Sequence, residues 1–149
     1  MSELNTVTRQ AGPSQASQLA RLRMASFGAV TMLIIEFILG MIYNLYGTAP
    51  TASKSIGLFS SPVLALHVIM SILLLVAAVM LLVRSIGARH RLTIWMSALG
   101  LAAIVAAGFA GLGYTGSGAA GASLGMSLAF AVSLACYVVI ILAASPSTT

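Results

Sequence analysis

The fold is decided by Met24-Ala-Ser-Phe-Gly-Ala-Val-Thr-Met-Leu-Ile-Ile-Glu-Phe-Ile-Leu-Gly-Met-Ile-Tyr-Asn-Leu-Tyr46, a segment long and apolar enough to cross a bilayer as one helix. Glu36 lies near its middle and is one of only two acidic residues in the chain. A carboxyl group in hydrocarbon costs several kcal/mol unless it is neutral, paired or facing a wet cavity. Other helices must therefore shelter this position.

The composition of the whole chain is that of a membrane protein. Of its 149 residues, 60% are hydrophobic and only 6% are charged, and the mean hydropathy is +1.08. Soluble domains carry about 25% charged residues, so a soluble helical bundle would lack the polar helix faces that it needs. The single cysteine, Cys136, excludes an internal disulfide framework and a cysteine-based metal cluster.

Four apolar segments are each long enough to span about 30 Å of hydrocarbon. They predict an all-α, up-down-up-down bundle of four transmembrane helices within 19–145, with spans at about 24–46, 62–84, 92–113 and 119–144. Residues 1–18 are rich in Ser, Gln and Thr, and we expect a disordered cytoplasmic tail there. Residues 146–149 form a short C-terminal tail in this prediction.

The basic residues predict the orientation. With the N-terminus inside, all of the seven basic residues except Lys54 lie on the cytoplasmic side. We therefore expect a multi-pass protein of the cell membrane with both termini cytoplasmic. Because these residues flank apolar segments and form no single patch, nucleic acid is not an expected partner. The residues expected to contact anionic lipid headgroups are Arg21, Arg23, Arg84, Arg89 and Arg91.

Polar residues inside two spans form the candidate site. Glu36, Gly40 and Asn44 recur every four residues with Tyr43 beside them, and His67 and Ser71 form a second stripe. Such residues in a membrane span suggest proton relay, ion pairing or ligand contact. The alternative is structural: a neutral Glu36 hydrogen-bonded across helices and a neutral His67 bonded to a hydroxyl or carbonyl.

The rise per residue gives the expected register between these two stripes. It sets Glu36 opposite Ser71 and Gly40 opposite His67, with Asn44 leaning toward the imidazole. A direct contact between Glu36 and His67 would have to bridge ~7 Å of depth, so we expect none. We expect Glu36 to be mostly neutral at pH 7.

His67 is also a candidate haem ligand. The only other histidine, His90, lies in the basic turn on the opposite side of the membrane, so one chain cannot form a bis-histidine site across its helices. His67 with Met126, or two His67 residues across a dimer, would supply the ligands instead.

Small residues at a spacing of four mark one face of each of the last two helices. They let helix backbones approach closely, either in a homodimer or within one bundle. Gly40 has the same role on the first helix. On the last two helices the residues are Gly100, Ala103, Ala107, Gly111, Gly121, Gly125, Ala129 and Ser133.

Leu39-Gly-Met-Ile-Tyr-Asn-Leu-Tyr46, followed by Pro50 and by Leu66-His67, resembles a pattern in small uncharacterised four-helix membrane proteins of bacteria and archaea. The resemblance covers the first two helices and implies the topology. The chain is more weakly similar to one four-helix half of a haem A synthase type of bundle. Those halves pair two histidines, whereas this chain lacks the second one.

The leading functional expectation is a non-catalytic accessory or helper subunit of a membrane assembly, with no catalytic residues and no metal site. One alternative is a b-type haem protein for electron transfer that uses His67. Another is a proton-coupled small-molecule transporter in which Glu36 titrates, although Phe37 is the only aromatic residue next to the acid in sequence. The expected partners are the lipid bilayer and either a second copy or a larger membrane complex.

Overall fold

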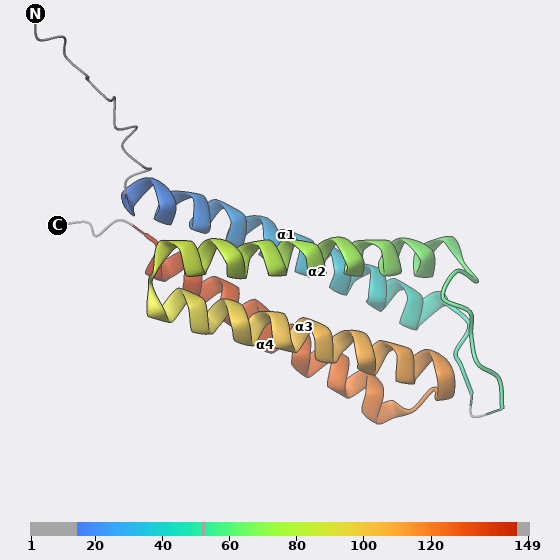
Figure 1. Cartoon of the computed structure of the whole chain (residues 1–149). Helices are drawn as coiled ribbons and strands as arrows, with labels where there is room; N and C mark the ends of the chain where they lie inside the picture. Colours follow the sequence, from blue (N-terminus) through green and yellow to red (C-terminus); the bar gives the residue numbers. More distant parts are fainter. Residues whose placement is uncertain (1–14, 52, 146–149) are drawn as a thin grey trace, which may run out of the picture.

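The computed structural model describes residues 15–51 and 53–145. Within these residues the chain forms four α-helices, α1 (Gln15–Tyr46), α2 (Pro62–Ala88), α3 (Arg91–Ser117) and α4 (Ala120–Ala143). All four are long and apolar enough to cross a membrane. The prediction of an all-α bundle of four such helices is confirmed. Figure 1 shows consecutive helices running in alternating directions, so the described region begins and ends at the same end of the bundle.

The helices extend beyond the predicted spans at the end that carries both termini. α1 begins at Gln15, inside the segment 1–18 that was expected to be a tail, and α2 continues to Ala88. Leu22 and Ala88 are both buried, so the added turns pack in the bundle. Hydropathy predicts only the part of a helix that lies in hydrocarbon. Packing and backbone hydrogen bonds stabilise further helical turns beyond that part. The rest of both predicted tails, 1–14 and 146–149, lies outside the described residues.

Local signals fix the ends of α2. Ser61 precedes it, and its side chain accepts a hydrogen bond from the backbone N–H of Leu64, while Pro62 occupies the first turn. At the other end Arg89 adopts the left-handed conformation, with φ at 54°. The chain then turns directly into α3.

The α1–α2 connector packs against the α3–α4 turn. The backbone N–H of Ile56 donates to the carbonyl of Thr115 at 3.0 Å. Gly118 has φ at +68°, and a Cβ there would collide with the carbonyl of Pro50. Only glycine combines this backbone conformation with so close an approach. The two loops therefore hold the helices together at the end of the bundle away from the termini.

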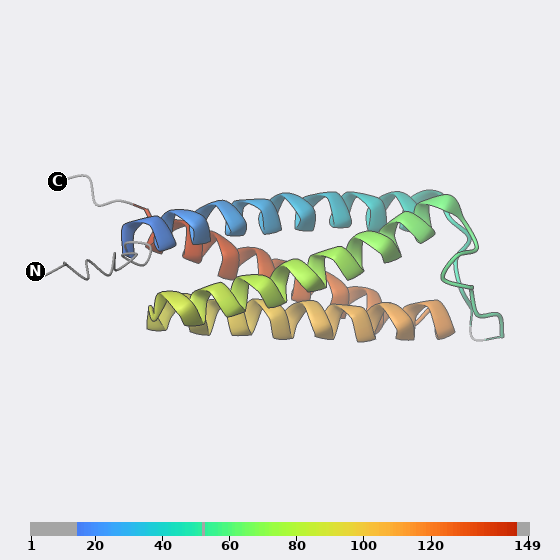
Figure 2. The same cartoon turned by 45° about the horizontal axis from the view of Figure 1, so that its top comes forward.

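Each helix packs against two others. The most extensive contact joins α3 to α4, and further contacts join α1 to α2, α1 to α4 and α2 to α3. Figures 1 and 2 show α2 and α3 close together at their shared turn and separated at the other end. The bundle is therefore closed where the termini lie and wider toward the α1–α2 connector.

Glycines bring α3 and α4 together, as the spacing of small residues predicts. A Cβ on Gly100 would lie 2.6 Å from the ring of Tyr137, and one on Gly125 would lie 3.6 Å from Ala110. Gly111 faces the sulfur of Met126 at 3.5 Å. These small residues make contacts within one chain, which favours the single-bundle alternative over a dimer seam.

The prediction for Gly121 is wrong. No atom would lie within 4 Å of a Cβ added there. Gly121 is exposed in the first turn of α4, so it is not part of the contact with α3.

Candidate functional site

Glu36 contacts two residues of α2 across the α1–α2 interface. Ser71 Oγ donates a hydrogen bond to Glu36 Oε1, and the same carboxyl oxygen lies 3.2 Å from His67 Nδ1. The side chains of Glu36 and His67 are 12% and 26% exposed, so the contact is largely shielded. His67 and Ser71 share one face of α2 because they are four residues apart.

The predicted register is correct in two respects and wrong in a third. Glu36 does lie opposite Ser71, and Gly40 does lie opposite His67, whose Cε1 would be 3.3 Å from a Cβ on Gly40. The expectation of no direct contact between Glu36 and His67 is wrong. The depth estimate compared positions along the helix axes, whereas the extended carboxyl and the imidazole ring together bridge about one helical turn. Because Gly40 has no side chain, the ring can lie against α1.

Asn44 does not extend the site as predicted. Its Oδ1 accepts a hydrogen bond from the hydroxyl of Tyr114 at 3.1 Å, which ties α1 to α3. Tyr43 donates its hydroxyl to the carbonyl of Thr48 at 3.2 Å. Both residues therefore brace the connector end of the bundle, and the expected bond from Asn44 to the imidazole is replaced by the bond to Tyr114.

A cavity of about 500 Å³ lies beside the Glu36–His67 pair. All four helices line it, and Leu58 of the connector contributes at one end. The lining is mainly apolar. Its polar groups are Glu36, His67 and Ser71, together with Asn44, two tyrosines and further hydroxyl side chains. Glu36 Oε2 is buried and has no hydrogen-bond partner among the described residues. Glu36 Oε2 and His67 Nδ1 are therefore two buried polar atoms, unsatisfied within the described residues, next to the apolar cavity.

The hydrogen bonds of Ser71 bear on the protonation of Glu36. Ser71 Oγ contacts both Glu36 Oε1 and the backbone carbonyl of His67, the latter at 2.9 Å. A serine hydroxyl carries one proton and cannot donate to both acceptors at once. Both contacts are satisfied when Ser71 donates to the carbonyl and a protonated Glu36 donates to Ser71. This arrangement suits the neutral acid expected from the sequence.

Both candidate haem ligands, His67 and Met126, line the same cavity. Met126 lies against Gly111 of α3, whereas His67 lies against Gly40 of α1. His90 precedes α3 at the opposite end of the bundle. Residues 15–51 and 53–145 contain no group of three or more His, Cys, Asp or Glu side chains placed to hold a metal ion.

Sequence reasoning missed a second set of buried polar groups, in the half of the bundle near the termini. Ser85 and Ser97 share a hydrogen bond of 2.7 Å, and both are fully buried. Ser26 and Tyr137 are also fully buried, and their hydroxyls have no partner among the described residues. Single hydroxyls in apolar helices usually bond to their own backbone, so the sequence carried no signal that they would gather.

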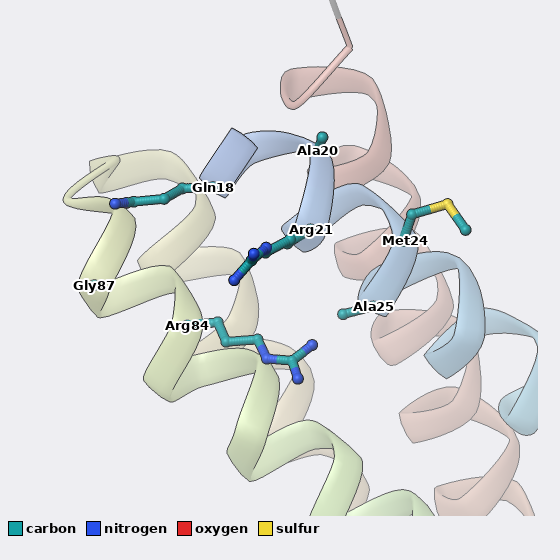
Figure 3. Close-up of a pocket in the computed structure, with 7 residues that line it drawn as sticks. All are labelled: Gln18, Ala20, Arg21, Met24, Ala25, Arg84 and Gly87. Carbon is teal, nitrogen blue, oxygen red and sulfur yellow. The ribbon is translucent and has the colours of Figure 1, made fainter. Parts of the chain in front are cut away.

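The predicted headgroup arginines lie at the end of the bundle that carries the termini. Arg21 of α1 and Arg84 of α2 line a groove between these helices, and Figure 3 shows both guanidinium groups directed into it. Arg23, Arg89 and Arg91 are exposed and do not line this groove. Of the predicted headgroup arginines, Arg21 and Arg84 are the two that line this groove.

Comparisons with protein-family models, with curated proteins and with solved structures find no match to this chain. Its function is therefore inferred from the geometry of its own residues.

Proposed function

We propose that the chain binds a small, mainly apolar molecule with a cationic group in the central cavity, and that Glu36 exchanges a proton for it as a proton-coupled carrier does. The observation that carries this proposal is the cavity itself. It combines apolar walls from four membrane-spanning helices with one contact between Glu36, His67 and Ser71. Ionisable groups inside a membrane bundle commonly mark substrate or proton paths.

The cavity has the size and lining of a small-molecule site. Ligand pockets commonly measure about 300–1,000 Å³ and combine apolar walls with a few polar groups. Phe37 of α1 stacks on Phe130 of α4, with ring centroids 4.6 Å apart, and both line the cavity. Phe109 and Tyr114 add aromatic surface. Aromatic faces attract cations. In sequence only Phe37 lies next to Glu36, whereas in the fold aromatic residues from other helices join it in lining the cavity.

Glu36 provides the point of exchange. A neutral Glu36 can bond to Ser71, as argued above, while its second oxygen, Oε2, is left without a protein partner. A cationic ligand that reaches this oxygen takes the place of the carboxylic proton, because one carboxylate then neutralises one positive charge. His67 lies 3.2 Å from the other oxygen, Oε1, and can relay the released proton to water, so that one proton leaves the site for each cation bound.

The test uses the purified full chain in liposomes, with tetraphenylphosphonium as a hydrophobic cation. An imposed proton gradient should drive accumulation of the cation against its own concentration gradient. Glu36→Gln retains the shape and the bond to Ser71 but cannot release a proton, so it should abolish this uphill movement. Ser127→Ala, at an exposed position on the cavity wall, is the matched control and should retain it. Uphill transport by Glu36→Gln would overturn the proposal.

A specific contact also favours haem as a second candidate. Histidines that bind metals usually donate their other ring nitrogen to a carboxylate or carbonyl, and Nδ1 of His67 lies 3.2 Å from Glu36. His67 would hold the iron through Nε2 and Met126 would be the second ligand, since both line the cavity. Haem would supply one-electron transfer. A Soret band in the visible spectrum of the purified chain, lost in His67→Ala, would support this candidate, and its absence after haem supplementation would exclude it.

An accessory role in a larger membrane assembly stays a prediction. The outer surface of α2 exposes apolar side chains, among them Ile72, Leu73 and Val76. Lipid tails and partner helices cover such a surface equally well, so its composition does not distinguish them.

A further inference from the structure

The groove between α1 and α2 at the end that carries the termini brings two positive charges together. Arg21 projects into it from α1 and Arg84 from α2, as Figure 3 shows. Ala20, Ala25 and Gly87 also line the groove. Gln18 of α1 also lines the groove (Figure 3).

These charges have no carboxylate to neutralise them in the part of the chain that the structure describes. Glu36 is the only acidic residue within 15–51 and 53–145, and it contacts His67 and Ser71 near the middle of α1. Two guanidinium groups directed into one groove repel each other unless an anion lies between them. The groove is therefore built for an anion from outside the described chain.

The surroundings indicate the kind of anion. Met24 lines the groove and is 74% exposed; Phe27, about one turn further into α1, is 62% exposed, and Val83, the residue before Arg84, is 58% exposed. Exposed apolar side chains thus lie on both helices near the level of the groove. We propose that Arg21 and Arg84 clamp the phosphate of one anionic phospholipid, whose acyl chains run along Met24, Phe27 and Val83. Guanidinium groups bind phosphate oxygens in paired, charge-assisted hydrogen bonds.

This clamp is independent of any ligand in the central cavity, and it differs from general attraction between arginines and headgroups. General attraction would involve every exposed arginine at this end of the bundle about equally. The clamp instead assigns binding to the one pair that shares a groove. Arg23 and Arg91 are exposed and lie outside it, which makes them matched controls for loss of charge.

The experiment counts bound lipids on the full chain in detergent by native mass spectrometry. Phosphatidylglycerol and phosphatidylcholine with identical acyl chains are offered at equal concentration. The unaltered chain should retain phosphatidylglycerol preferentially. Arg21→Gln with Arg84→Gln should lower its affinity about tenfold or more, as expected for lost charge-assisted bonds. Arg23→Gln with Arg91→Gln should keep the affinity within about twofold. Arg84→Lys keeps the charge without the planar fork and should give an intermediate affinity.

Several results would overturn the clamp. Equal losses in the two double variants would mean diffuse surface charge. No preference for phosphatidylglycerol in the unaltered chain would mean that the groove does not select an anionic lipid. Competition by millimolar inorganic phosphate would assign the groove to free phosphate. Circular dichroism and thermal unfolding check that each variant is folded. If the double clamp variant does not fold, the single change Arg84→Gln, compared with Arg91→Gln, decides the same question.

Discussion

Gly40 controls how closely the imidazole of His67 approaches Glu36. The ring lies where a side chain on α1 would otherwise be, with Cε1 3.3 Å from the position of an added Cβ. The same ring carries Nδ1 to within 3.2 Å of the Glu36 carboxyl. One missing side chain on α1 therefore makes the contact between the two ionisable groups possible.

Gly40→Val should separate the two groups without removing either. A branched side chain at this position displaces the imidazole, so binding of tetraphenylphosphonium should weaken about tenfold, equivalent to about 1.4 kcal/mol. Gly28→Val on the same helix is the control, because no atom lies within 4 Å of a Cβ there. Equilibrium dialysis measures both variants. Unchanged binding in Gly40→Val would mean that the position of the His67 ring is irrelevant to the cavity.

Leu73 and Leu74 are neighbours in sequence and differ completely in environment. Leu74 is 3% exposed and belongs to the core, whereas Leu73 is 50% exposed on the outer surface of α2. Leu74→Ala should lower the free energy of unfolding by about 2 kcal/mol or more, because it leaves a cavity between packed helices. Leu73→Ala should change it by less than about 1 kcal/mol. Unfolding in detergent micelles compares the two, and similar losses would place Leu74 outside the core.

Individual residues of the site could be predicted to different degrees. Glu36, His67 and Ser71 stand out because polar groups are rare in apolar helices, and their register follows from helix geometry. The direct contact of Glu36 with His67 depends on side-chain rotamers, which helix geometry does not give. The partner of Asn44 is Tyr114, from a third helix whose position relative to α1 no periodicity specifies. Leu74 lies three residues after Ser71 and seven after His67, so helical spacing places it on their face of α2, whereas Leu73 lies outside that face.

At the scale of elements, the contact between α3 and α4 depends on Gly100. Tyr137 is fully buried and its ring packs directly on this glycine. Gly100→Ala should destabilise the chain by about 1–3 kcal/mol, because a Cβ 2.6 Å from the ring forces the helices apart. Gly113→Ala, in the same helix with open space around it, should be neutral or slightly stabilising. A thermal-unfolding series in one detergent compares them, and equal midpoints would contradict close packing at Gly100.

The α3–α4 turn gives a separate prediction for the loops. Gly118→Ala adds a Cβ to a residue with φ at +68° and drives it into the Pro50 carbonyl. The added strain and the collision should cost more than about 1 kcal/mol and should loosen the connector over the cavity. Hydrogen exchange at the backbone N–H of Ile56, which donates to Thr115, reports this loosening. Protection equal to that of the unaltered chain would show that the contact is dispensable.

Element boundaries were predictable where a local signal exists. Pro62 and Ser61 fixed the start of α2 because their capping chemistry is local. The membrane span of α1 was predicted to begin at Met24, where the apolar run begins, whereas the helix itself begins nine residues earlier, at Gln15. The contact between α3 and α4 was predicted because small residues at a spacing of four persist over several turns. Gly121 was included wrongly, because this spacing does not show where along the helix the contact ends.

At the scale of the whole molecule, the two ends of the bundle differ in construction. The end that carries the termini is closed by buried hydroxyls, such as the pair Ser85 and Ser97, and bears every described arginine. The other end is wider, encloses the cavity and is covered by the α1–α2 connector, whose one charged residue is Lys54. The asymmetry of charge thus coincides with an asymmetry of shape, so the orientation of the chain decides which side of the membrane the cavity faces.

The positive-inside rule predicts that the end with the termini is cytoplasmic, which makes the cavity nearer the outer surface. Single cysteines at Ser53 and Ser145 test this, because both residues are exposed and lie at opposite ends of the bundle. The background is Cys136→Ala, which removes the one native thiol, itself buried in α4. In intact cells a membrane-impermeant maleimide should label the cysteine at 53 and leave the one at 145 unlabelled until the membrane is permeabilised.

The reverse pattern would invert the orientation, so that the cavity lies nearer the cytoplasm and the arginine groove faces the outer leaflet. Three helices, α2, α3 and α4, lie between these two positions, so the two cysteines should lie on opposite sides of the membrane. Labelling of both cysteines in intact cells would contradict this, and the four helices would then not all cross the membrane.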